Sequence, residues 1–237
     1  MPTFHRIRRL KHIAYKYGIH RALPQRRLGF LHYAGAMSRW ISEHRDIGYT
    51  DFPNPGFDSA RRYGLYEYVI EHAGLDGPID YLEFGVSTGE SFRWWVGRIG
   101  HVDARFHGFD TFTGLPEAWG PFPVGAMANG NAPPAIDDAR VRFHQGLFQQ
   151  TLYPFLAGYD DSRRKVIHLD ADLHSATLFV LTTLSRHLKP GDILLFDEFN
   201  VPMHEFKAFS EWVAAYYVEY EVLGEVNNYY QVAMRLK

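Results

Sequence analysis

From residue 74 onward, short apolar runs alternate with segments of helical spacing. Five apolar runs have the length of buried strands: residues 79–84, 105–109, 141–144, 165–170 and 192–196. Five segments have the apolar spacing of helices: residues 59–73, 90–99, 152–156, 175–188 and 206–216. Alternation of this kind is typical of a parallel sheet covered by helices. The pattern therefore predicts an α/β fold with a mostly parallel sheet.

The C-terminal end of the chain follows a different pattern. Residues 219–226 and 229–236 alternate apolar and polar positions around Asn227 and Asn228, which predicts an antiparallel hairpin. The segment 111–139 is rich in Gly, Pro and Ala. Connections of that length are usually lids or binding loops, and we expect a lid there.

The N-terminal end predicts a helical extension. Residues 1–50 have helical, aromatic-rich character without a strand signal, and a Pro- and Gly-containing loop follows at 51–56. We therefore expect an extension over residues 1–58, acting as a lid or dimer arm, and one domain over residues 59–237.

Charge separates this extension from the rest of the chain. Residues 1–27 hold eight Lys or Arg and no acid, so the remainder carries 17 basic and 27 acidic groups, a net charge of −10. The first interpretation is that the basic arm packs on its own acidic body or on a second subunit, which predicts a homo-oligomer. Attraction to a membrane surface, to nucleic acid or to an anionic substrate is the alternative, and nucleic acid is the least favoured.

Composition excludes several classes of protein. The chain contains no cysteine, so disulfides and thiolate metal sites are absent. It has no run of about 18 apolar residues that would span a membrane and no apolar core of a secretion signal at its start. These features favour the cytoplasm.

Carboxylates follow two of the predicted strands. Asp170 and Asp172 end the run at 165–170, and Asp197 and Glu198 end the run at 192–196. Parallel strands present their carboxyl ends at one edge, where open α/β sheets bind ligands. Four carboxylates there would repel one another unless a hard cation such as Mg²⁺ lies among them.

A glycine-containing turn follows the first strand. Glu83, Gly85 and Gly89 form an acid-x-G-x-x-x-G pattern that opens the next helix. A dinucleotide loop would have G-x-G-x-x-G spacing, so this spacing favours S-adenosylmethionine over NAD, although a structural turn remains the alternative. Ser87 and Ser91 belong to the same cofactor-binding segment.

The second and third strands add cofactor candidates. Asp110 ends the second strand, where an acid commonly accepts hydrogen bonds from ribose hydroxyls, or alternatively caps a helix. Gln145, Gly146 and Phe148 follow the third strand, where adenine would lie with Phe148 as a stacking partner.

Four motifs occur in the order and spacing of a known family. They are Glu83-x-Gly85-x-x-x-Gly89, Gly108-Phe109-Asp110-Thr111-Phe112-x-Gly114-Leu115-Pro116-Glu117, Leu169-Asp170-Ala171-Asp172-Leu173 and Phe196-Asp197-Glu198. Together they resemble the macrocin O-methyltransferase family, class I S-adenosylmethionine-dependent enzymes that methylate sugar hydroxyls in macrolide and aminocoumarin antibiotics. The resemblance covers about residues 60–237. It implies a Rossmann-like methyltransferase fold and a divalent cation.

The resemblance also implies roles for single residues. Asp170, Asp197 and Glu198 match the metal ligands, and Asp172 matches the general base. The family usually has Asp at the position of Glu198 and Tyr at the position of His174, so His174 replaces the packing role of that tyrosine or adds a second base.

The expected function is metal-dependent transfer of a methyl group from S-adenosylmethionine to a hydroxyl of a sugar or glycosylated natural product. Two alternatives stay open at this point. One is a non-catalytic cofactor-binding protein of the same fold. The other is a glycosyltransferase that uses Asp170 and Asp172 as an Asp-x-Asp metal motif.

Overall fold

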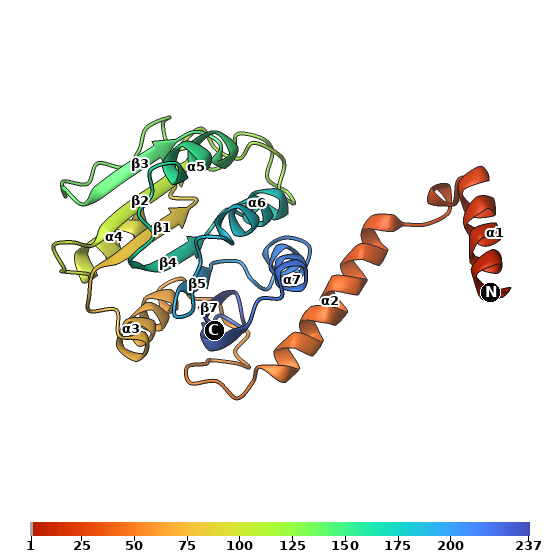
Figure 1. Cartoon of the computed structure of the whole chain (residues 1–237), viewed down its shortest axis with the longest axis horizontal. Helices are drawn as coiled ribbons and strands as arrows, with labels where there is room; N and C mark the ends of the chain where they lie inside the picture. Colours follow the sequence, from red (N-terminus) through yellow and green to blue (C-terminus); the bar gives the residue numbers. More distant parts are fainter. Residues whose placement is uncertain (1) are drawn as a thin grey trace.

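The computed structural model describes residues 2–237 and contains a seven-stranded sheet (Figure 1). The strands are β1 (Ile79–Phe84), β2 (Arg105–Asp110), β3 (Val141–Gln145), β4 (Arg164–Leu169), β5 (Ile193–Phe196), β6 (Tyr220–Val226) and β7 (Gln231–Leu236). Their spatial order is β3-β2-β1-β4-β5-β7-β6. The first five are parallel, whereas β7 runs antiparallel to β5 and to β6. The predicted α/β fold with a terminal antiparallel hairpin is confirmed.

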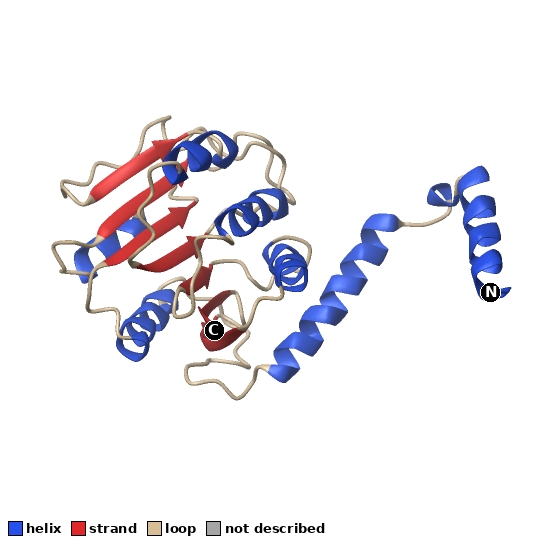
Figure 2. Cartoon of the chain, in the orientation of Figure 1, coloured by secondary structure: helices blue, strands red, loops and turns tan. Residues whose placement is uncertain are grey.

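Helices cover both faces of this sheet (Figure 2). The helices are α3 (Arg61–Ala73), α4 (Glu90–Arg98), α5 (Phe148–Leu156), α6 (His174–Leu184) and α7 (Glu205–Tyr216). Successive strand side chains point to opposite faces, so Tyr81 joins the core beneath α3 and α4, while Leu82 joins the core beneath α6 and α7. Both residues are fully buried, as expected for a parallel strand with helices on both of its faces.

The start of α5 differs from the sequence expectation. The helix begins at Phe148 rather than at residue 152, and the side chain of Gln150 accepts a hydrogen bond from the Leu147 N–H at 3.2 Å. This bond satisfies one of the unpaired N–H groups at the helix start. The helix is therefore extended by one turn toward the end of β3.

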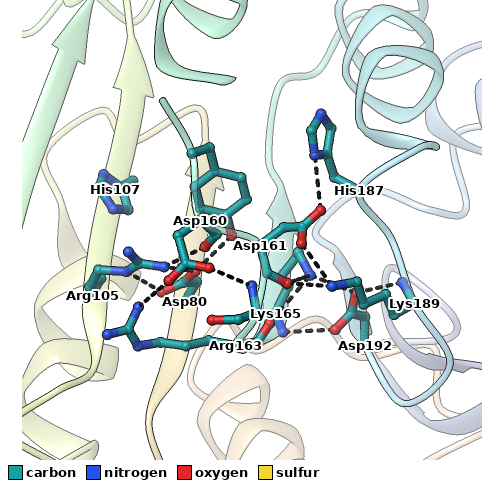
Figure 3. A network of polar contacts seen from close by, with 12 residues as sticks. Asp80, Arg105, His107, Asp160, Asp161, Arg163, Lys165, His187, Lys189 and Asp192 are labelled. Carbon is teal, nitrogen blue, oxygen red and sulfur yellow. Dashed lines mark hydrogen bonds and ion pairs between the residues drawn. The ribbon is translucent and has the colours of Figure 1, made fainter. Parts of the chain in front are cut away.

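The amino edge of the sheet is held by charged side chains (Figure 3). Arg105 donates two hydrogen bonds to Asp80, at 2.6 and 2.5 Å, and Tyr159 donates to the same carboxylate at 2.8 Å. Nearby, the fully buried Lys165 lies 3.4 Å from Asp192. A buried charge is tolerated only when it is paired, so this network secures the edge opposite the ligand-binding one.

His107, on β2 near this network, makes the stability of the fold depend on pH. Burial and the neighbouring His144 ring, 3.2 Å away, lower the pKa of His107 to about 4. A histidine with a lowered folded-state pKa binds fewer protons when folded. The stability it contributes is complete above an unfolded pKa of about 6.5 and is lost as the pH falls toward 4.

We therefore expect wild type to lose more stability than His107→Gln when the pH falls from 7.5 to 5. The expected difference is roughly 1–2 kcal/mol, because the half-buried ring keeps some contact with solvent. Urea unfolding at the two pH values measures it. Equal losses in the two proteins would contradict the assignment.

The predicted N-terminal helical extension is confirmed. It contains α1 (Pro2–Lys16), the short 3-10 helix η1 (Ile19–Arg21) and α2 (Gln25–Glu43). The C-terminal half of α2 packs on the body, where Met37 and Trp40 are buried and the Trp40 Nε1–H donates to the Tyr220 hydroxyl at 2.8 Å. The N-terminal end of α2 and all of α1 project away from the sheet (Figure 1). Within residues 2–237, no helix has the length and apolar character needed to cross a membrane.

Candidate active site

A cavity of about 540 Å³ opens at the carboxyl edge of the sheet, which the strand arrowheads mark in Figure 2. Its walls come from the segments that follow β1, β2, β4 and β5, and from the long connection at 111–139. The strand order reverses between β1 and β4. Ligands of open α/β sheets bind at such a switch point.

The loop after β1 is pressed against the loop after β4. Gly85 has a φ of +97°, and a Cβ atom built there would lie 1.8 Å from the carbonyl oxygen of Asp170. Gly89, at a φ of +80°, precedes α4. Only glycine fits both the backbone conformation and the close approach at position 85. The free N–H groups of α4 then form an anion-binding end.

Asp110 holds this glycine-containing loop and also lines the cavity. Its Oδ2 accepts hydrogen bonds from the N–H groups of Val86 and Ser87, both at 2.8 Å, and its Oδ1 accepts one from Phe112 at 2.7 Å. An ionised carboxylate has about four acceptor positions. Asp110 therefore retains acceptor capacity for a ribose hydroxyl.

Asp110→Ala is expected to weaken cofactor binding by roughly 1–3 kcal/mol, the range for lost hydrogen bonds to a charged group. Part of the loss comes from the loop that the carboxylate orders. Calorimetric titration with S-adenosylhomocysteine measures it. Asp103→Ala, at an exposed turn outside the cavity, is the matched control, and equal affinity of the two variants would reject the role of Asp110.

Two predicted cofactor residues lie beneath the loop instead of along the cavity. Glu83 is fully buried on β1, accepts a hydrogen bond from Ser91 at 2.8 Å, and also accepts one from the Tyr81 hydroxyl. Neither Glu83 nor Ser91 is among the cavity-lining residues. Their contacts tie β1 to the start of α4, so they would act on the cofactor through the loop.

The remaining predicted cofactor residues divide between two hollows. Ser87 and Phe148 line the cavity. Gln145 and Gly146 line a neighbouring hollow that shares Gly114 and Leu147 with the cavity.

The predicted acidic cluster forms at the floor of the cavity. Oxygen atoms of Asp170, Asp172 and Glu198 lie within 4.8 Å of one another, and a second such group joins Asp170 and Asp197 to His168. Loops from β4 and β5, which are neighbours in the sheet, bring these residues together. The structure thus places the four sequence-predicted acids in two neighbouring groups that share Asp170.

Burial and mutual proximity disfavour the ionised form of these carboxyl groups. Burial raises the pKa of Glu198 to about 12, helped by the adjoining carboxyl of Asp172, and burial and Asp197 raise the pKa of Asp170. In the described part of the chain, no donor reaches the buried Oε2 of Glu198. Two acceptor groups in contact require a proton or a cation between them. The donor set therefore fits a hard cation such as Mg²⁺.

Asp172 also has an unusual backbone. Its φ is +58°, in the left-handed region that few residues other than glycine adopt. Such strain costs of order 1–3 kcal/mol and concentrates at functional sites. The conformation aims a largely buried carboxyl group into the cavity, as a general base requires.

Three site residues were not recognised in the sequence. Arg62 of α3 places Nη1 3.2 Å from Asp197, and the Tyr230 hydroxyl donates to Glu198 at 3.1 Å. Glu205, fully buried at the start of α7, accepts the N–H of Glu198 at 2.9 Å. None of the three belongs to a local motif. The one sequence signal was the position of Glu205 directly before the helix predicted from residue 206.

His174 is directed away from the cavity. Its Nε2 lies 2.8 Å from Glu211 of α7, and the same carboxylate accepts a hydrogen bond from Tyr33 of α2 at 3.0 Å. His174 does not line the cavity, although Leu173 and Ser175 do. This geometry favours a packing role that links α6, α7 and α2.

The fold and the cavity define a class: a Rossmann-like enzyme that binds an adenosyl cofactor beside acidic residues. A family model described as "Methyltransferase domain" matches residues 82–199. This match and the relatives described below support an S-adenosylmethionine-dependent O-methyltransferase, in agreement with the resemblance seen in the motifs. Its cofactor is S-adenosylmethionine.

Individual relatives agree with this assignment. The chain is 27% identical to mycinamicin III 3''-O-methyltransferase of Micromonospora griseorubida, over 74% of this chain and 80% of the relative. It is 29% identical to 8-demethyl-8-(2,3-dimethoxy-alpha-L-rhamnosyl)-tetracenomycin-C 4'-O-methyltransferase of Streptomyces olivaceus, over 60% of this chain and 61% of that one. The crystal structure of the calicheamicin methyltransferase CalS11 has the same fold, with a TM-score of 0.59 and 21% identity over 75% of this chain and 80% of that chain.

Proposed function

We propose that the protein transfers a methyl group from S-adenosylmethionine to a hydroxyl of a sugar or glycosylated natural product, with the help of a divalent cation. The observation that carries the proposal is the single cavity that joins the Gly85 loop to Asp172 and its acidic neighbours. Two relatives, named as methyltransferases of mycinamicin III and of a rhamnosyl tetracenomycin, support the sugar-bearing acceptor.

The residues of this chain suggest the roles in the reaction. The N-terminus of α4 would hold the cofactor carboxylate, and Asp110 the ribose. The acceptor oxygen attacks the methyl carbon as the carbon–sulfur bond breaks and its electron pair returns to sulfur. Asp172 takes the acceptor proton, so S-adenosylhomocysteine and a methyl ether form. A cation held by Asp170, Asp197 and Glu198 would supply Lewis-acid polarisation of the acceptor hydroxyl.

The segment 111–139 would enclose the acceptor. Leu115 and Met127 from this segment line the cavity beside Ala176, an apolar wall suited to the ring face of a sugar. The Ser175 hydroxyl donates to Glu117 and connects the segment to α6. We therefore propose that the segment 111–139 forms the predicted lid. We also propose that residues 1–58 and residues 59–237 are separate functional parts.

Release of S-adenosylhomocysteine from a panel of glycosides and their matched aglycones tests the function. We expect turnover with at least one sugar-bearing acceptor and none with its aglycone. A chelator is expected to lower the rate at least about 100-fold, and Mg²⁺ to restore it. A rate unaffected by the chelator would reject the cation, and turnover of aglycones alone would reject the sugar acceptor.

Neither the non-catalytic alternative nor the glycosyltransferase alternative gains support, since fold, family and relatives are those of methyltransferases. A cytoplasmic location and a homo-oligomeric state remain predictions, and we propose both.

A further inference from the structure

The cavity is lined by several acids and by one basic side chain. Within the described part of the chain, six carboxyl groups line it, and Arg62 is the one Lys or Arg that does so. The acids suit the sulfonium and ammonium groups of S-adenosylmethionine, which are positively charged. They repel its methionyl carboxylate, so that end of the cofactor needs a positively charged partner.

Arg62 lies in the first turn of α3, on the same face of the sheet as α4. The two helices share one core, and Tyr63, next to Arg62, stacks on Trp94 of α4 with ring centroids 5.7 Å apart. The first turn of α4 offers N–H groups and a partial positive charge. Arg62 adds a full positive charge, because a guanidinium stays protonated in proteins.

The guanidinium of Arg62 is held in place before any ligand binds. Its Nε donates to the carbonyl oxygen of Ser59 at 3.0 Å, and its Nη1 lies 3.2 Å from Asp197. These contacts engage two of the five N–H donors of a guanidinium, so others remain for a ligand. The side chain is 19% exposed, which leaves it accessible from the cavity. A group that is ordered in advance loses less entropy on binding.

We propose that Arg62 binds the carboxylate of the methionyl group and thereby selects a cofactor with an intact amino-acid end. Arginine matches the geometry of a carboxylate with two parallel N–H donors. The inference rests on the cofactor part of the proposed function. It is independent of the acceptor and of the cation.

Calorimetric titration with two ligands tests the assignment. The ligands are S-adenosylhomocysteine and its decarboxylated analogue, which keeps the thioether and the ammonium group. Wild type is expected to bind S-adenosylhomocysteine roughly 10–100-fold more tightly than the analogue, the range for a lost hydrogen bond to a charged group. Arg62→Gln should lose this preference, because its affinity falls for S-adenosylhomocysteine and stays the same for the analogue. Arg62→Lys, which keeps the charge, should recover part of the preference.

Arg61→Gln is the matched control, because it removes the same charge from the same turn of α3. Arg61 pairs with Asp51 at 2.9 Å and does not line the cavity, so this variant should keep the wild-type preference.

Two results would overturn the role of Arg62: an Arg62→Gln variant that keeps the preference, or one that loses affinity for both ligands equally. If Arg62→Gln does not fold, Arg62→Lys takes its place, and a preference equal to that of wild type would overturn the proposal. A wild type that binds neither ligand would overturn the cofactor assignment itself, and this proposal with it.

Discussion

Asp172→Asn is expected to lower the rate of methyl transfer about 10²–10⁴-fold, the usual contribution of a positioned general base. The affinity for S-adenosylhomocysteine should change little, because Asp172 contacts Glu198 rather than the cofactor loop. Asn tolerates the left-handed backbone at this position, so the variant should preserve the shape of the cavity. Single-turnover kinetics and calorimetric titration measure the two effects separately.

Asp137→Asn is the matched control, since this exposed residue lies outside the cavity and should leave both quantities unchanged. Full turnover of Asp172→Asn would show that the carboxylate only positions the start of α6. The role of base would then have to pass to another group in the cavity.

Gly85→Ala is expected to remove cofactor binding and to lower the free energy of unfolding by at least about 3 kcal/mol. Two costs combine at this position: a strained positive φ and a backbone collision that no rotamer change relieves. The new methyl group would lie 1.8 Å from the Asp170 carbonyl oxygen. The collision would therefore also displace the start of the acidic loop.

Gly97→Ala provides the comparison. Gly97 lies in α4, is exposed, and has nothing within 4 Å of its built Cβ atom. Alanine should stabilise the protein there by about 0.5–1 kcal/mol, as in other helix interiors. Urea unfolding and titration with S-adenosylhomocysteine distinguish the variants, and similar values for both would contradict the close packing of the two loops.

The fold was largely predictable because its strands are buried on both faces. Residues 193–196 are apolar at every position, four of the six residues at 79–84 are apolar, and the polar hairpin turn at Asn227 is equally clear. The start of α5 was harder to predict, because the Leu147–Gln150 hydrogen bond that extends this helix has no apolar periodicity.

The acidic part of the site was predictable for a related reason. Strand ends meet at one edge, so Asp170 and Asp197 had to lie close together once their strands were adjacent. Arg62 and Tyr230 reach the same acids from elements far away in the sequence, and no local pattern marks them. Glu83 belongs to the cofactor motif, yet strand alternation turns its side chain toward α4 and beneath the loop.

Arg62 affects where a cation could bind, because its guanidinium already contacts Asp197, one of the proposed ligands. The ion pair with Asp197, at 3.2 Å, neutralises part of the acidic cluster, but within the described residues no donor reaches the Oε2 atom of Glu198. Hard cations prefer such carboxylate oxygens. A bound cation would therefore lie beside Arg62 rather than replace it.

Anomalous diffraction from crystals grown with Mn²⁺ and S-adenosylhomocysteine would locate a bound cation. We expect a manganese peak among the oxygens of Asp170, Asp197 and Glu198, with the ribose on Asp110. A cofactor bound as described, with no manganese beside those carboxylates, would contradict this expectation.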